Sequence, residues 1–374
     1  MVPTQKKNIV KGIEKILLSG RNKNIFSAAS VAFFDNGLAK DEHFTISCGC
    51  TDDSKTVKID NSTFFDLASL TKPLVTLLSI LTLIEKKELS WFDTVDTLLP
   101  GYNPHYYMDV DIYHLLCHSS GLPAHREYWR ALETIDTGER KQWLICEITG
   151  EKGVFKKGSK HLYSDLGYLL LGFIVEEITG QNLACFWNES ITKPMGLERE
   201  LLFPVPCPAR IDNFAVTSVP DQNRLQAVVH DDNSRALGGI TGHAGLFGTA
   251  TGVLTLCQEL LLSINGKTNS LPFSTQILKR ACLRVGDSEW TAGFNLPSRH
   301  GSSSGNYLSE KSIGHLGFTG TSFWIDPVKQ LAVVLLTNRV IKGEKQDGIR
   351  ALRPSVHDYI IEQLRLENKS PHPD

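Results

Sequence analysis

Hydrophobic positions near the two ends of the chain follow two different periods. Residues 5–20 place isoleucine and leucine on one stripe at helical spacing, and residues 348–368 show a similar pattern, which predicts a helix at each end. Between them, short apolar runs bounded by turn-forming residues are typical of strands. These runs are at 27–34, 44–50, 312–316, 322–325 and 331–336. We therefore expect an antiparallel sheet with the terminal helices packed beside it.

The middle of the chain has a different pattern. From residue 86 to residue 235 helical patterns alternate with loops, and one helix is expected over 166–179, where Gly180 ends the apolar repeat. We expect a mainly helical domain, residues 86–235, inserted into an α/β sheet domain made of residues 1–85 and 236–374. The predicted fold class is therefore α+β.

Composition narrows the function classes. The 374 residues are 41% hydrophobic and 21% charged, as in ordinary globular proteins, and the net charge of −2 gives no electrostatic footprint for nucleic acid or an anionic membrane. Residues 1–20 lack the apolar run of a secretory signal, and the apolar run 74–84 is too short to span a bilayer. Eight scattered cysteines are expected to be reduced core residues. We expect a cytoplasmic protein without a membrane anchor.

Two local patterns could suggest a metal site. His114 and His118 are four residues apart and could face one zinc ion, but no glutamate follows His114 as a metalloprotease would require. Cys48 and Cys50 have no second cysteine pair at zinc spacing. We therefore expect neither a metal nor a cofactor.

The stretch 64–74 carries the strongest candidate chemistry. An apolar pattern follows it as far as residue 84, which predicts a buried helix with Ser69 in its first turn. Ser69 and Lys72 are three residues apart, so a helix places both on one face. A lysine can take the serine proton only if its ammonium is destabilised. We expect burial and the helix dipole to lower the pKa of Lys72 for that purpose.

The same spacing occurs a second time. Ser190 and Lys193 are also three residues apart, but Pro194 and Gly196 follow them and predict a turn where the first copy has an apolar helix. Lys193 would then lack an apolar environment. We expect Ser69, and not Ser190, to be the nucleophile.

Six short motifs follow one another along the chain: Phe65-Asp66-Leu67-Ala68-Ser69-Leu70-Thr71-Lys72, His114-Leu115-Leu116-Cys117-His118-Ser119-Ser120-Gly121-Leu122-Pro123, Tyr163-Ser164-Asp165, Val229-His230-Asp231, Gly242-His243-Ala244-Gly245-Leu246-Phe247 and Gly314-His315-Leu316-Gly317-Phe318-Thr319-Gly320-Thr321. In this order, and over residues 25–340, the chain resembles the serine β-lactamase and penicillin-binding-protein superfamily. It is most similar to the class C-like serine hydrolases, which include D-alanyl-D-alanine peptidases and esterases.

The resemblance implies an active cleft between the sheet domain and the helical domain. Ser69 would be the acylated nucleophile, Lys72 its general base, and Tyr163 a proton shuttle to the leaving group and from the deacylating water. Because a phenol beside a lysine can share its proton, the two groups would titrate together. The oxyanion hole would be formed by the backbone N–H groups of Ser69 and Phe318.

Two departures from the family pattern concern substrate recognition. The second motif usually reads Tyr-x-Asn, but Asp165 stands here in place of the amide, which keeps an acceptor for Lys72 and loses a donor for a substrate carbonyl. The third motif, Lys-Thr-Gly or His-Thr-Gly in most relatives, reads His315, Leu316 and Gly317, so that a hydroxyl is missing. A cleft role is expected for His315. Both exchanges weaken the case for β-lactam or acyl-D-Ala-D-Ala recognition.

The expected function is that of a serine hydrolase that forms an acyl-enzyme on Ser69 with a small ester or amide substrate. The alternatives are a β-lactamase or D-alanyl-D-alanine carboxypeptidase with the same chemistry, and a non-catalytic binding protein on the same fold. Intact Ser69, Lys72 and Tyr163 argue against the last. The oligomeric state is not readable from the sequence.

Overall fold

The structure is a computed structural model that describes residues 3–35, 43–54, 57–102, 107, 109–205, 213–217, 227–343 and 347–367. Its main sheet has five antiparallel strands in the order β2-β1-β8-β7-β6. The strands are β1 (Ala28–Asp35), β2 (His43–Gly49), β6 (Ile313–Leu316), β7 (Ser322–Asp326) and β8 (Leu331–Thr337). The antiparallel sheet and its α+β class are confirmed, and each predicted strand agrees to within one or two residues at its ends.

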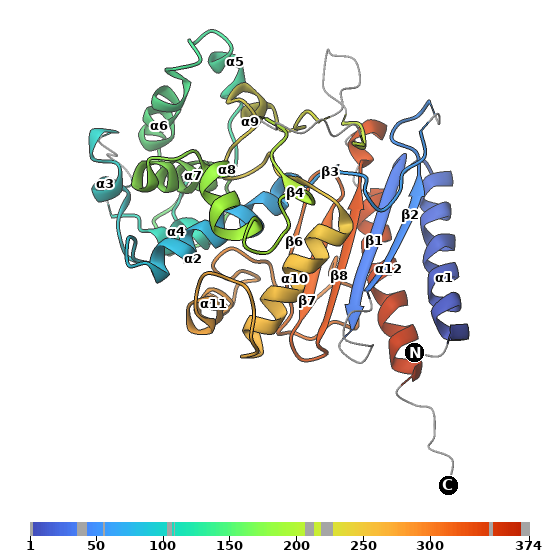
Figure 1. Cartoon of the computed structure of the whole chain (residues 1–374). Helices are drawn as coiled ribbons and strands as arrows, with labels where there is room; N and C mark the ends of the chain where they lie inside the picture. The colour runs from blue at the N-terminus through green and yellow to red at the C-terminus, as the bar shows by residue number, and fades with distance from the viewer. Residues whose placement is uncertain are drawn as a thin grey trace.

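The terminal helices cover one face of the sheet and a third helix covers the other (Figure 1). Helices α1 (Pro3–Asn22) and α12 (Asp347–Glu367) contact each other and share an apolar layer with Val31 and Val333. Helix α10 (Ala250–Ile264) contacts β1 and β8 from the opposite face, where Ala32 and Val334 point. Strand alternation explains the two layers, because successive side chains point to opposite faces of a sheet.

Helices dominate the remainder of the chain. They are α2 (Leu78–Glu85), α3 (Val95–Leu98), α4 (Ile112–Leu116), α5 (Trp129–Leu132), α6 (Arg140–Gly150), α7 (Asp165–Thr179), α8 (Leu183–Trp187), α9 (Asp232–Ala236) and α11 (Thr275–Ala281), with shorter helical turns η1 (Ala68–Leu70), η2 (Lys72–Leu77), η3 (Pro100–Tyr102), η4 (Asn188–Thr192) and η5 (Arg339–Lys342). A small sheet of β3 (Phe65–Asp66), β5 (Phe247–Gly248) and β4 (Leu201–Leu202) lies beside them. In Figure 1 the helices α3 to α8 gather away from the terminal helices.

One long apolar element, η1 to α2, runs through the interior. Within the described residues, Ala68–Glu85 is the one helical stretch that is long and apolar enough to cross a membrane by itself, and 83% of it is buried inside the structure. It contacts α7, α8 and α11. Such burial is expected of the core helix of a globular fold, which must be apolar all round.

Helix α7 begins and ends on local signals. Ser164 caps it by accepting the Gly167 N–H, and Gly180 ends it in the left-handed conformation at φ 65°, which glycine adopts without a steric cost. The predicted span 166–179 is therefore confirmed. The cap at Ser164 thus fixes the position of Asp165, the first residue of α7, which follows Tyr163 by two residues.

Candidate functional site

Ser69 lies on a strained turn between β3 and the central helical element. Ala68, the residue before it, has a left-handed backbone with φ 49°, which costs a non-glycine residue about 1–2 kcal/mol. The turn is held by the Asp66 carboxylate, whose Oδ1 accepts the Ala68 N–H at 2.8 Å, and by Thr71 Oγ1, which donates to the Ala68 carbonyl at 2.7 Å. Strain supported in this way fixes the direction of the Ser69 side chain.

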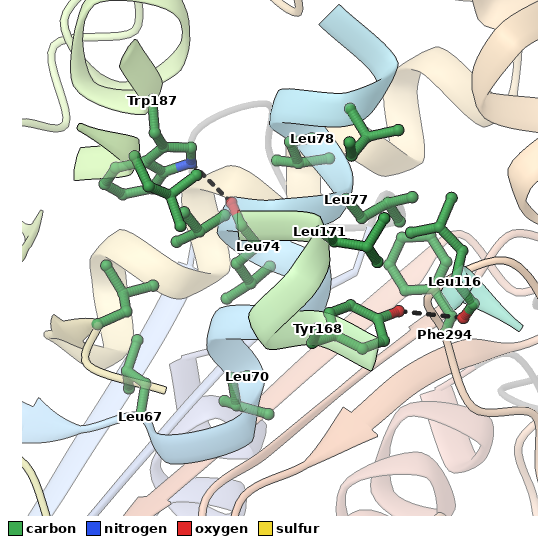
Figure 2. Close-up of a cluster of buried hydrophobic side chains, with 14 of the residues drawn as sticks. Leu67, Leu70, Leu74, Leu77, Leu78, Leu116, Tyr168, Leu171, Trp187 and Phe294 are labelled. Atoms are coloured by element: carbon green, nitrogen blue, oxygen red, sulfur yellow. Dashed lines mark hydrogen bonds between the residues drawn. The ribbon is translucent and has the colours of Figure 1, made fainter. Parts of the chain in front are cut away.

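The helix after Ser69 is not regular, contrary to the single buried α-helix predicted. Ser69 lies in the 3₁₀ turn η1, the π-helical segment η2 begins after Thr71 and covers Lys72–Leu77, and α-helical geometry starts at Leu78. Figure 2 shows leucine side chains of this element together with Leu116 and Leu171 from other helices, and the Trp187 indole N–H that donates to the Leu74 carbonyl at 2.8 Å. The indole thus ties α8 to the π-helical segment.

Lys72 is completely buried and its ammonium has three acceptors. Its Nζ lies 3.1 Å from Ser69 Oγ, 3.1 Å from the His243 carbonyl oxygen and 2.7 Å from Asp165 Oδ1. The Tyr163 phenol is a further hydrogen-bonding neighbour of this ammonium, which has three N–H donors. The predicted proximity of Ser69 and Lys72 is confirmed, and so is the acceptor that Asp165 provides for Lys72.

The expected lowering of the Lys72 pKa is wrong for this arrangement. Burial does act to lower the pKa of Lys72, but the Asp165 carboxylate and the Tyr163 phenol outweigh it and raise the pKa above its ordinary value. Burial likewise acts to raise the pKa of Asp165, while Lys72 and a hydrogen bond from His125 hold it well below the usual range. The pair is therefore an ammonium and a carboxylate at neutral pH.

Tyr163 joins the site from the segment before α7. Its phenol interacts with the side chains of both Lys72 and Ser69, and its ring lies 4.9 Å from Lys72 Nζ. Burial raises the pKa of Tyr163, although Lys72 acts in the opposite direction. The ring packs against His118 and Trp290, with centroids 4.6 Å and 5.7 Å away. The phenol is therefore neutral and held in place beside the serine.

Two histidines beside the site have structural hydrogen bonds. His118 Nδ1 accepts the Ser164 N–H at 3.1 Å, which requires a neutral ring, and burial together with Lys72 holds its pKa well below the ordinary value. His243 contacts Asp231 Oδ1 through Nε2 at 2.9 Å. This contact orients the segment whose carbonyl accepts from Lys72.

The end of β6 approaches the nucleophile from the sheet. His315 is buried, lies 6.0 Å from the Tyr163 ring between centroids, and has its pKa lowered to about 3 by burial and by the Lys72 charge. Two threonines attach the turn from 317 to 321 to the residues just before Ser69. Thr321 Oγ1 donates to the Leu67 carbonyl at 3.1 Å, and Thr319 Oγ1 donates to the Asp66 carbonyl at 2.7 Å.

Gly317 and Phe318 lie in this turn. A Cβ on Gly317 would be 2.8 Å from the Leu67 carbonyl oxygen, so only glycine allows this close approach to the nucleophile segment. The Phe318 ring is 40% exposed and stacks on the His230 ring at 5.5 Å. The oxyanion role of the Phe318 N–H stays a prediction.

The rival serine does not share these surroundings. Ser190 lies in η4, but Lys193 is exposed at the turn that follows, as predicted. The part of the chain that the structure describes contains no cluster of three metal-binding side chains, and His114 is paired with Asp111 at 2.6 Å. The seven cysteines within it are free, yet Cys146 and Cys185 are exposed, so the expectation of core positions is wrong for these two.

Sequence reasoning missed two residues of the site. His125 contacts Asp165 Oδ2 through Nδ1 at 3.3 Å, forty positions away along the chain. Arg353, on α12, donates from Nη2 to the carbonyls of Gly317 and Thr321 at 2.8 Å each and so supports the turn that carries Phe318. Neither residue belongs to a local motif, and only the tertiary fold brings them here.

A serine, a lysine and a tyrosine at the junction of an antiparallel sheet and a group of helices define a class of serine hydrolases. The sequence model named Beta-lactamase matches residues 22–356, so the chain belongs to the beta-lactamase family and is a hydrolase of that family. The expected resemblance and enzyme class are confirmed.

Several relatives have names. A provisionally named D-alanyl-D-alanine carboxypeptidase of Escherichia coli (strain K12) is 32% identical over 76% of this chain and 70% of its own length. An N-acetylmuramyl-L-alanine amidase of Bacillus subtilis (strain 168) is 31% identical over 75% of this chain and 69% of its own length.

Solved structures support the fold at lower identity. EstCE1, a hydrolase with promiscuous acyltransferase activity, has a TM-score of 0.74 at 20% identity, covering 96% of this chain and 98% of its own. The octameric penicillin-binding protein homologue from Pyrococcus abyssi has a TM-score of 0.73 at 20% identity, covering 96% of this chain and 77% of its own. These likenesses show the β-lactamase/transpeptidase-like fold.

Proposed function

We propose that the protein hydrolyses a small ester or amide through an acyl-enzyme on Ser69. The observation that carries this proposal is the 3.1 Å contact between Ser69 Oγ and the buried Lys72 Nζ, with the Tyr163 phenol interacting with both. No other Ser-x-x-Lys pair of the chain has a buried lysine, because Lys193 of the Ser190 pair is exposed.

The proton balance follows from the contacts of Lys72. Its ammonium must first release one proton to bulk water before it can act as a base, because the neighbouring Tyr163 phenol is already protonated. The proton that then remains on the Lys72–Tyr163 pair can be shared between the two groups. The neutral amine then takes the Ser69 proton as Oγ bonds to the acyl carbon. The N–H groups of Ser69 and Phe318 stabilise the oxyanion, and Tyr163 gives its phenol proton to the leaving group while it takes up the proton that Lys72 received from Ser69. Water then attacks the acyl carbon and gives a proton to the same pair, which passes it to Ser69 Oγ as the bond between Oγ and the acyl carbon breaks.

We propose that the substrate side of the site is formed by Asp165, His315, Gly317 and Phe318. Asp165 binds Lys72 and His125 with its two oxygens, so it offers no amide donor to a substrate carbonyl. Leu316 offers no hydroxyl. Recognition would therefore rest on the backbone near Gly317 and on the exposed Phe318 ring, which suits a small ester or amide better than a peptide carboxylate.

A second candidate is a D-alanyl-D-alanine carboxypeptidase, with a β-lactamase as its variant. The E. coli relative with this name supports it, because its similarity covers 76% of this chain. A non-catalytic binding protein is the third.

Three further proposals concern the protein as a whole. We propose that residues 1–85 with 236–374 form one domain and residues 86–235 another, and that the partner is a small molecule. We also propose that the protein is cytoplasmic, which its free cysteines support.

The test is intact-mass spectrometry after reaction with a fluorophosphonate probe. We expect one adduct on the native protein and on Ser190→Ala, and none on Ser69→Ala. Labelling that survives Ser69→Ala would rule out the proposal, and a folded native protein without any adduct would favour a binding protein. p-Nitrophenyl esters of increasing acyl length, nitrocefin and an acyl-D-Ala-D-Ala peptide then separate the candidates, with Ser69→Ala as the blank.

A further inference from the structure

The Asp165 carboxylate is held from two sides. Its Oδ1 lies 2.7 Å from Lys72 Nζ inside the protein, while its Oδ2 lies 3.3 Å from Nδ1 of His125. The exposed fraction of the side chain rises from 0% at Lys72 to 18% at Asp165 and 47% at His125. These three side chains, together with Ser69, form a continuous line of contacts from the nucleophile to solvent.

The backbone keeps His125 beside this carboxylate. The Asp165 N–H donates to the Ala124 carbonyl at 2.9 Å, and Ser164 Oγ donates to the Pro123 carbonyl at 2.6 Å. The segment before His125 is therefore attached to the start of α7, where Asp165 lies. With the contact of the imidazole itself, three contacts hold the two segments together, so the place of His125 does not depend on the ion pair alone.

The charges around His125 favour its protonated form. Asp165 on α7, Asp231 before α9 and Glu127 on the same loop all act to raise the pKa of His125, with the Asp165 hydrogen bond as the largest cause and burial acting in the opposite direction. The neighbouring cation, Arg126, is paired with Glu151 through contacts of 2.9 and 3.2 Å. His125 therefore carries a positive charge over more of the neutral pH range than a free histidine.

The other groups that face Asp165 complete the electrostatic setting. Besides Lys72 and His125, they are the phenol of Tyr163, the carboxylate of Asp231 and the imidazoles of His118, His243 and His315. Of these groups, His125 is the one with an exposed side chain. Its protonation can therefore respond directly to the pH of the solution.

We propose that His125 is a positioning residue that limits the hold of Asp165 on Lys72 and thereby eases the release of the lysine proton. This inference rests on the proposed function of Ser69 and Lys72. When His125 is protonated, it shares the carboxylate charge, and the ammonium of Lys72 loses part of its stabilisation. When His125 becomes neutral at higher pH, Asp165 stabilises the ammonium fully. His125 thus extends the activity of the enzyme toward lower pH.

The test compares the pH dependence of kcat/KM for p-nitrophenyl acetate between the native protein and His125→Gln. We expect the variant to be slower by about threefold or more near pH 6, which corresponds to a shift of about half a pH unit in the acidic limb, and equal to the native protein near pH 9. His125→Lys, which keeps a positive charge, should restore the rate near pH 6. His114→Gln is the matched control, because it breaks a His–Asp pair that has no contact with Lys72.

A double-mutant cycle tests whether the effect acts through Asp165. In the Asp165→Asn background, His125→Gln should leave the acidic limb unchanged, because the carboxylate it acts on is gone. The inference would be overturned if the ratio of kcat/KM between the native protein and His125→Gln did not change with pH. It would also be overturned if His125→Gln lowered kcat/KM equally in the native and Asp165→Asn backgrounds, because His125 would then contact the substrate directly. Fluorophosphonate labelling of Ser69 in the native protein separates the two proposals. If it is absent, the proposed function fails, and if it is present with a pH-independent ratio, only the role of His125 fails.

Discussion

Replacing Asp165 by asparagine is the change that most directly tests the proton chemistry of the site. The carboxylate lies 2.7 Å from the Lys72 ammonium, and two unit charges at that separation attract each other by about 6 kcal/mol at an effective dielectric constant of about 20. The asparagine oxygen can still accept one N–H, so only part of this energy is lost. One pKa unit corresponds to about 1.36 kcal/mol, so the loss of even a quarter of the attraction changes the Lys72 pKa measurably.

The sign of the effect follows from the role of Lys72. Asp165 favours the charged amine, whereas a base must be neutral, so Asp165→Asn should lower the pKa of Lys72 and make it neutral at lower pH. We expect the acidic limb of the pH dependence of kcat/KM to move by about one unit or more to lower pH. Esterase assays between about pH 5 and pH 10 with p-nitrophenyl acetate measure this limb.

Stability gives an independent measurement on the same variant. With its partner removed, Lys72 is an unpaired buried cation whose pKa falls below that of the unfolded chain, so the free energy of unfolding should rise with pH through the neutral range. Asp109→Asn is a matched control, because Asp109 also pairs with a lysine at 2.7 Å but is 72% exposed. An Asp165→Asn acidic limb that stays in place, or moves to higher pH, would refute the account of Lys72 as the base.

Three further substitutions test contacts that support the site. Trp187→Phe leaves the Leu74 carbonyl without the indole donor at 2.8 Å. The free energy of unfolding, measured in urea, should fall by about 1–3 kcal/mol. An unchanged midpoint of urea unfolding would show that water replaces the indole. Gly242→Ala puts a Cβ 2.0 Å from the Tyr168 carbonyl oxygen. It should lower the free energy of unfolding by about 1–3 kcal/mol and the thermal midpoint by several degrees. A midpoint equal to that of the native protein would contradict the close packing. Arg353→Met removes two 2.8 Å hydrogen bonds to the turn that carries Phe318. It should lower kcat by about tenfold with little change in KM. If Arg353 has only a structural role, the variant will be less stable but will keep its kcat.

Local patterns were sufficient for the main sheet, for α7 and for contacts between residues that lie close in sequence. Alternating apolar runs gave the strands of the main sheet, and the spacing of Ser69 and Lys72 predicted a contact that the structure has at 3.1 Å. The irregular helix from Lys72 to Leu77 was not predictable, because tertiary packing and the Trp187 contact compensate for its unusual hydrogen bonds.

Long-range electrostatics were beyond the reach of the sequence. The substitution of Asp165 for an amide was visible in the motif, but its effect on Lys72 depends on a distance of 2.7 Å in a buried setting. His125 gave no signal at all, because its partner is forty residues away and its loop has no recognisable pattern. The direction of the Lys72 pKa was therefore wrong when it was judged from burial and the helix dipole alone.

The π-helical segment Lys72–Leu77 also restricts how this protein can change by insertion or deletion. A π-helical turn contains one residue more than the α-helical turn that could replace it, and each residue of an α-helix rotates the following side chains by about 100°. Loss of one residue between 73 and 77 would therefore return the segment to α-helical geometry and leave α2 in the same direction relative to Ser69. An inserted residue, or the loss of a second one, could not be absorbed in this way and would turn α2 by about 100°, so that its leucines would leave their neighbours. The segment thus tolerates the loss of one residue and no other change of length.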